Sequence, residues 1–217
     1  MSVNPKEDTV AGGEQWVPVL QVFPKYPSLY SLVKSIDKHG TKLMNDQLGL
    51  QPQDALVFMK TIPLSPITST DTATVPLSGH IFPLAMAWPF TITKETTDGN
   101  GILAHGALLT LVDMFTSLHL MVARLPQFVG HVSVSLQCNT VQSMREGESI
   151  VAVTRVDKMG KRLLFSSVEF LSSNALTGLE DNDRMNVIQT AIQDHKVCAN
   201  AKHVKSLLPP STDAKVI

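Results

Sequence analysis

The stretch 102-ILAHGALLTLVD-113 brings together residue types that could do chemistry. A His-Gly pair, His105 and Gly106, stands before a long apolar run that ends on Asp113. Because moving a carboxylate out of water costs free energy, a buried acid is rare unless it is paired or has a function. Buried acids with shifted pKa values also mark functional sites. We therefore take Asp113 as the first candidate for a catalytic carboxylate.

A helix over residues 105–124 has to carry Asp113. This segment is apolar on nearly all sides, which indicates that it lies inside or under a sheet. The apolar run from Leu103 to Ala123 is close to the ~20 residues that span a bilayer. It contains Asp113 and His119, however, and an acid at the centre of a membrane helix costs about 2.5–3.5 kcal/mol. We therefore expect a buried helix and no membrane span.

Strand-like segments surround this helix. Around Ser133, valines alternate with serines, as in a strand with one buried face. A tight turn at Met159-Gly160 joins two later segments into a hairpin. The expected strands lie at 55–62, 80–96 with an interruption near Pro83 or Pro89, 129–141, 148–159, 161–172 and 196–208.

The composition is that of an ordinary globular chain, with 217 residues, 43% hydrophobic and 17% charged. We expect a single domain over 25–208, which opens with a broken amphipathic helix over 26–48. Within it, 63–79 is a loop rich in Pro, Ser and Thr, and 173–195 is a polar insertion with a short helix. Residues 1–24 are expected to form a flexible leader and 209–217 a tail.

Charge and cysteine content exclude several classes of protein. The net charge is −1 and no long basic block is present, so no nucleic-acid partner is expected. Cys138 and Cys198 lack CxxC spacing, and the histidines lack a metal-ligand spacing around Asp113, so neither a disulfide framework nor a metal site is expected. Reduced thiols and an N-terminus without a secretory signal predict an intracellular protein, cytoplasmic first and mitochondrial as the alternative.

Residues from about Thr96 to Val168, together with 197–208, resemble a hotdog-fold acyl-CoA thioesterase. The nearest type is the thioesterase superfamily member 2 group and its phenylacetyl-CoA-hydrolysing relatives. The resemblance implies an α+β fold, in which an antiparallel sheet wraps around one long buried helix. The matching pieces, in ungapped order, are 108-LLTLVD-113, 132-VSVSL-136, Gly147 and 160-GKRLLFSSVEF-170.

The resemblance also implies an activity and roles for particular residues. The expected reaction is hydrolysis of acyl-CoA to a free acid and coenzyme A, with no further cofactor. Asp113 takes the position of the family's general base or nucleophile, and Ser133 that of the hydroxyl that orients water. The backbone N–H groups of His105 and Gly106 take the position that stabilises the oxyanion at the helix start.

The match departs from the family pattern at the start of the helix. His105 lies eight residues before Asp113 rather than nine, so it occupies the position of the family's first glycine. A one-residue bulge in the helix would restore its usual place. Asp98 stands where the family has an asparagine donor, and an ionised carboxylate only accepts hydrogen bonds. Asn100, two residues on, could supply an amide to the substrate instead.

Three basic residues of the last strand, Lys202, His203 and Lys205, match positions that lie near the nucleotide in the family. We expect them to contact coenzyme A phosphates, although lysines near strand ends also serve to protect sheet edges.

The leading prediction is therefore an acyl-CoA thioesterase, assembled as a homodimer or homotetramer because the sheet leaves an open edge. The alternative is a catalytically degenerate hotdog protein that acts as a scaffold or assembly subunit. A hotdog hydratase or dehydratase is a third option, but it would need a different Asp and His arrangement. An enzyme should need Asp113 for its rate and little for its folding.

Overall fold

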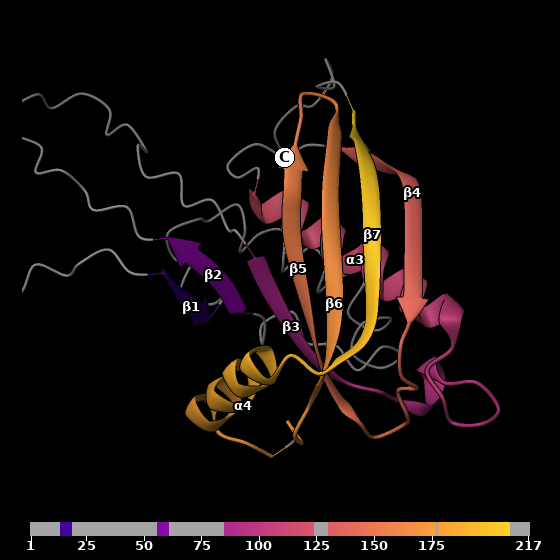
Figure 1. Ribbon diagram of the computed structural model, residues 1–217, viewed down its shortest axis with the longest axis vertical. Helices are drawn as coiled ribbons and strands as arrows, with labels where there is room; N and C mark the ends of the chain where they lie inside the picture. The colour runs from indigo at the N-terminus through magenta and orange to yellow at the C-terminus, as the bar shows by residue number, and fades with distance from the viewer. Residues whose placement is uncertain (1–13, 19–55, 61–84, 124–129, 177, 209–217) are drawn as a thin grey trace, which may run out of the picture.

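The computed structural model describes residues 14–18, 56–60, 85–123, 130–176 and 178–208 (Figure 1). The helices in this part of the chain are α3 (His105–Ala123), α4 (Asp181–Asp194) and the short 3-10 turn η4 (Lys94–Thr96). The strands are β1 (Glu14–Pro18), β2 (Leu56–Lys60), β3 (Ala85–Thr91), β4 (His131–Thr140), β5 (Ser149–Met159), β6 (Leu163–Ser173) and β7 (Val197–Leu207).

The strands form one antiparallel sheet in the order β1-β2-β3-β5-β6-β7-β4. The hairpin of β5 and β6 and the neighbouring β7 make its long centre, because each of these strands has 11 residues. β4 follows α3 in the chain but lies at the edge of the sheet, beside β7 (Figure 1). Among the described strands, β7 is the one with which β4 pairs.

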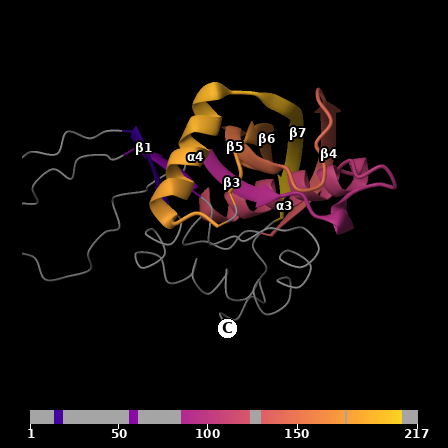
Figure 2. The ribbon, with the colours of Figure 1, turned by 90° about the horizontal axis from the view of Figure 1, so that it is seen from below.

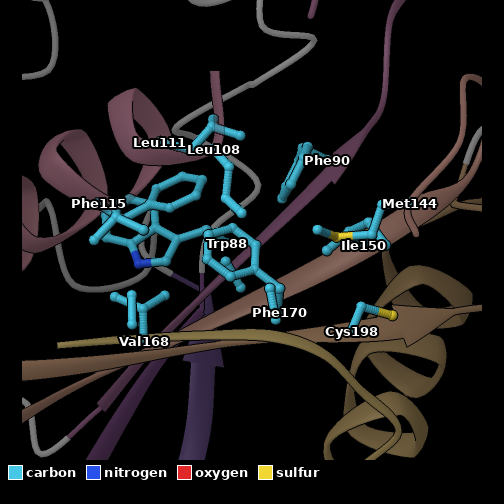
Figure 3. Packing of buried hydrophobic residues seen from close by; sticks show 14 of the residues in the cluster. Trp88, Phe90, Leu108, Leu111, Phe115, Met144, Ile150, Val168, Phe170 and Cys198 are labelled. Atoms are coloured by element: carbon cyan, nitrogen blue, oxygen red, sulfur yellow. The ribbon is translucent and has the colours of Figure 1, made fainter. Parts of the chain in front are cut away.

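The helix α3 packs across one face of the sheet and α4 lies on the other face (Figure 2). The Phe115 ring of α3 is fully buried, with its centroid 5.3 Å from that of Trp88 and 6.4 Å from that of Phe170. These aromatic rings and neighbouring aliphatic side chains fill the space between α3 and the sheet (Figure 3). The expected antiparallel sheet around one buried helix is therefore confirmed.

The helix α3 is also long and apolar enough to cross a membrane, judged by length and composition alone. In the structure, however, its buried side chains face strands of the sheet.

The helix in the expected insertion, α4, covers part of the outer face of the sheet. Its residues Ile188 and Ala191 are buried against a cluster that includes Val151 and Leu171. The helix ends at His195, which adopts the left-handed conformation with φ 51°. The insertion therefore adds a second, smaller core instead of standing away from the domain.

The expected long helix and the strands near 55–62, 129–141, 148–159, 161–172 and 196–208 are confirmed, with small differences at their ends. The segments 26–48, 63–79 and 209–217 lie outside the described residues. The expectation of a flexible leader over 1–24 is wrong for Glu14–Pro18, because these residues form β1. This strand is only five residues long and pairs with β2. The centroid of the Trp16 ring lies 5.2 Å from that of Phe58 on β2.

Pro89 does not interrupt its strand, and Pro83, the other place where an interruption of 80–96 was expected, lies outside the described residues. Pro89 lies within β3 and pairs with Val151 of β5. The recorded pairing between β2 and β3 ends at Ala87. Pro89 therefore lies where β3 has one described partner strand instead of two, and a sheet tolerates a residue without an N–H at such a place.

Phe115→Ala should destabilise the domain by about 3–5 kcal/mol, because it removes a fully buried ring from the aromatic cluster. Urea denaturation monitored by circular dichroism measures this change. The matched control is Phe165→Ala on β6. Phe165 is 38% exposed, so this substitution should lower the free energy of unfolding by about 1 kcal/mol or less. Equal losses for the two variants would contradict the described core.

Candidate functional site

One face of α3 carries polar and small residues, although the helix is otherwise apolar. Gly106, Thr110, Asp113 and Ser117 are three or four residues apart in sequence, so they line one side of the helix. All four are exposed or half-exposed, whereas most of the helix between them is buried against the sheet. The side chain of Asp113 is 51% exposed. Asp113 therefore lies at the open rim of the core.

Strand β7 brings two ionisable residues to the same rim. Successive side chains in a strand point to opposite faces, so His203 and Lys205 share the face that meets α3. Their side chains are 0% and 1% exposed, whereas that of Lys202 on the outer face is 69% exposed. The pairing of β4 with β7 places Ser133 directly opposite Lys205. Three elements thus converge on Asp113.

Oδ1 of Asp113 accepts two hydrogen bonds, one from Ser133 Oγ and one from Lys205 Nζ, each 2.8 Å long. Partial burial by itself would raise the pKa of Asp113, but the hydrogen bonds from Lys205 and Ser133 outweigh it and lower the pKa below its usual value. Asp113 is consequently ionised at neutral pH. Burial lowers the pKa of Lys205, and its contact with Asp113 opposes that change.

His203 is held in one tautomer by Thr116. The hydroxyl of Thr116 donates to the carbonyl oxygen of Val112 at 2.8 Å, so its Oγ1 must accept the hydrogen bond from His203 Nδ1, also 2.8 Å long. Burial, aided by the positive charge of Lys205, lowers the pKa of His203 to about 4. The ring is therefore neutral at pH 7, with its proton on Nδ1 and a lone pair on Nε2.

Ser133 has one hydroxyl proton for two acceptors. Oδ1 of Asp113 lies 2.8 Å from its Oγ, and Nε2 of His203 lies 3.0 Å away. While Asp113 is ionised and His203 neutral, only one of these acceptors can receive the proton. The cluster of Asp113, Ser133 and His203 is therefore arranged to take up one further proton.

The start of α3 offers unpaired backbone donors. The first recorded hydrogen bond of the helix runs from the N–H of Leu108 to the carbonyl oxygen of Ala104, which leaves three earlier N–H groups without a partner among the described residues. His105 and Gly106 are exposed there. The helix is regular from its first residue, so the one-residue bulge that would realign His105 is absent from it. A Cβ at Gly106 would meet nothing within 4 Å, so packing does not require glycine there.

Asp98 closes the turn before the helix. Its Oδ1 accepts hydrogen bonds from the N–H groups of Asn100 at 2.8 Å and Ile102 at 3.1 Å. These two backbone hydrogen bonds lower the pKa of Asp98. The carboxylate is thus engaged by its own loop and supports the turn that leads into α3. The side chain of Asn100 lies in the same exposed turn.

The three basic residues of the last strand do not act as a group. Lys202 points outward and donates to Asp157 Oδ2 at 3.0 Å, away from the carboxylate of Asp113. Buried His203 and Lys205 do not fit the expected contact with coenzyme A phosphates, because neither side chain reaches the surface. Within the described ranges, no group of three or more His, Cys, Asp or Glu side chains could hold a metal ion.

Two members of the site, Thr116 and Ser117, were not predicted from the sequence. They follow Asp113 by three and four residues, so both can contact groups that approach Asp113 from the sheet. A signal was present, because polar side chains at these spacings are unusual in an apolar helix. The alternation of Ala199 and Ala201 with outward polar residues also indicates which side of β7 faces the core.

Comparisons with known proteins agree with this fold. Residues 100–178 match the model of the thioesterase superfamily. The mouse thioesterase superfamily member 2 has a similar structure, with 17% identity, a TM-score of 0.50, and coverage of 82% of this chain and 97% of that one. A variant of a thioesterase from Pseudomonas aeruginosa matches with 13% identity, a TM-score of 0.50, and coverage of 82% and 93%. A comparison with curated protein sequences finds no significant match.

The chain therefore has an α+β hotdog fold, defined by an antiparallel sheet that wraps around a single core helix. Its segment 100–178, which contains α3, β4, β5 and β6, is the part that matches the thioesterase superfamily model.

Acid should destabilise the domain through His203. The pKa of His203 is lower in the folded protein than in the unfolded chain, so its contribution is complete above about pH 6.5 and is lost as the pH falls towards about 4. For this fully buried ring the loss is on the order of 3 kcal/mol.

Urea denaturation at pH 7 and at pH 4.5 measures this loss, with the wild type beside His203→Gln and the exposed His105→Gln as control. The wild type and the control should weaken more than His203→Gln. An identical pH dependence in all three proteins would contradict the buried neutral ring.

Proposed function

We propose that this protein is a thioester hydrolase that cleaves acyl-CoA to a free acid and coenzyme A, with Asp113 as the group that activates water. The observation that carries the proposal is the ionised carboxylate of Asp113 at the open rim of α3, hydrogen-bonded by Ser133 and Lys205 within the thioesterase segment. The neutral His203 behind Ser133 supports it, because it provides a second acceptor for the hydroxyl proton.

In the proposed reaction, water attacks the thioester carbonyl carbon while its proton moves to Asp113. Once protonated, Asp113 no longer competes as a charged acceptor, so the Ser133 hydroxyl can turn to Nε2 of His203. The tetrahedral intermediate then loses coenzyme A as the C–S bond breaks. The coenzyme A thiolate accepts the proton that Asp113 took from water. One water is consumed, and one carboxylic acid and one thiol are formed.

The oxyanion of that intermediate needs preorganised donors, and the open N–H groups at His105 and Gly106 suit it. Gly106 and Asp113 are seven residues apart, which separates them by about 10 Å along the helix. A carbonyl group must lie about 3 Å from its N–H donors and close to the attacking water. We therefore propose that the donors and the carboxylate of one site come from two copies of the chain.

The edge strand β4 supports such a pairing. Its residues Val132 and Val134 are 49% and 59% exposed, and a long edge strand with apolar side chains is prone to pair with another strand. Two β4 strands joined across a twofold axis would extend the sheet and bring both Asp113 side chains close to the interface. We propose a homodimer formed in this way.

The first test compares thiol release from short, medium, long and aromatic acyl-CoAs by wild type and Asp113→Asn. We expect hydrolysis by the wild type and a loss of at least 100-fold in the variant, because the amide cannot accept the proton from water. The matched control is Asp157→Asn on the outer face, where Ser167 and Lys202 contact that carboxylate much as Ser133 and Lys205 contact Asp113. It should retain full activity.

Asp113→Asn also carries a cost in stability, contrary to the expectation that Asp113 matters little for folding. It leaves the buried ammonium of Lys205 without a counter-ion, which destabilises by about 3 kcal/mol. Rates are therefore compared at a temperature at which both proteins are folded. A folded wild type that hydrolyses no thioester in the panel would refute the enzyme and favour the scaffold alternative.

The shared site is tested by complementation. Gly106→Val should be folded but inactive, because a Cβ at this position meets nothing within 4 Å among the described residues and the side chain would enter the space proposed for the substrate. Mixed with the equally inactive Asp113→Asn, it should form dimers in which one of two sites is intact. Activity should return to about a quarter of the wild-type value, because half of the dimers are mixed.

Analytical ultracentrifugation of the same mixture, and of Val132→Lys, reports the oligomeric state. The lysine variant should dissociate more readily than a Val141→Lys control, whose residue lies beyond the end of β4. Mixed dimers that form but stay inactive would contradict a site shared between copies.

A further inference from the structure

Lys205 is unusual because its charged end is buried. Its side chain is 1% exposed, whereas lysine ammonium groups almost always remain in water. Nζ donates to Asp113 Oδ1 and to Ser117 Oγ, each at 2.8 Å. Ser117 gives its own proton to the main-chain oxygen of Asp113 at 2.7 Å, so its Oγ is free to accept from the ammonium. The residue that carries the carboxylate thus helps to fix the lysine.

The two oxygens of Asp113 differ in their surroundings. Oδ1 receives the hydrogen bonds of Ser133 and Lys205. Oδ2 receives none from the part of the chain that the structure describes, and half of the Asp113 side chain is exposed. A carboxylate held through one oxygen from the core side presents its other oxygen outward.

We propose that Lys205 is the positioning residue of the site: together with Ser133 it holds Oδ1 of Asp113 and thereby directs Oδ2 to the water that attacks the thioester. This inference rests on the proposed thioester hydrolysis. It gives Lys205 a role through Asp113, without contact with the substrate, in place of the phosphate contact expected from its position in the sequence.

Among the groups around Asp113, Lys205 contributes most to lowering its pKa. On β7 these groups are Lys205 and His203, whose ring is neutral. On β4, His131 acts on His203, and the neutral Ser133 contacts the carboxylate. Lys205 is thus the cation that hydrogen-bonds to Asp113 among the described residues. Removing it should make Asp113 easier to protonate.

The kinetic experiment compares Lys205→Met with Lys196→Met, an exposed lysine just before the same strand. Each variant is assayed with the best acyl-CoA of the panel and with the N-acetylcysteamine thioester of the same acyl group, which lacks the nucleotide phosphates. Lys205→Met should lose at least tenfold in kcat on both substrates at pH 7, and the acid limb of its kcat/KM profile should move up by about 1 pH unit. Lys196→Met should behave as the wild type.

A loss that appears only in KM and only with the acyl-CoA would overturn the proposal in favour of phosphate contact. An acid limb that does not move in folded Lys205→Met would overturn it as well. Lys205→Gln, which keeps a donor but not the charge, tests the same point if Lys205→Met fails to fold.

A second readout does not depend on activity. The Asp113 carboxyl carbon, followed by ¹³C NMR, should titrate below the ordinary aspartate value in the wild type and about 1 pH unit higher in Lys205→Met. An unchanged midpoint in the variant, or an ordinary value in the wild type, would show that Lys205 does not control the carboxylate. A wild type that hydrolyses no thioester would instead refute the proposed function, so the two failures are distinguishable.

Discussion

The contact between Lys205 and Asp113 is the interaction on which the rest of the site depends. An ammonium group inside a protein needs an opposite charge nearby, because the interior replaces little of the hydration that it loses. Asp113 supplies that charge from the rim of α3, and Lys205 in return keeps the carboxylate ionised and oriented. In this pair, the buried Lys205 needs a counter-ion, and the half-exposed Asp113 can also meet a substrate.

This pair exists only because helix α3 and strand β7 are held in one relative position. The core between them is built from apolar side chains such as Leu111 and Phe115, which fix the rotation of the helix about its axis. That rotation turns Asp113 towards the rim and Thr116 towards His203. The polar network at the rim is therefore a consequence of hydrophobic packing a few ångströms away.

The two faces and the edge of the sheet have different surroundings. Helix α3 occupies the inner face, and α4 covers part of the outer face with its own small core. The edge formed by β4 has no partner on its outer side within the described chain, and it carries Ser133 next to the carboxylate. A surface that joins an open edge to the rim that carries Asp113 suits a site completed by a second copy, which is why we place the proposed dimer there.

The sequence predicted the elements that have strong local signals. The apolar periodicity around Asp113 predicted the buried helix, and alternation around Ser133 predicted its strand, because both patterns follow from the burial of one segment. The sequence predicted less where the local signal was short or weak, because pairing with another strand decides the structure there. The five residues Glu14–Pro18 form a strand that pairs with β2, and Pro89 lies in β3 beyond the described pairing with β2.

The sequence by itself determined that one acid lies in an apolar helix and that a serine follows on the next strand. It did not determine the partners of that acid. His203 and Lys205 are 90 and 92 residues away from Asp113. The alternation along their strand indicates which face they share, but nothing local pairs them with Asp113. Only the tertiary structure decided that they meet Asp113, because the register of β4 and β7 and the rotation of α3 are set by packing across the whole domain.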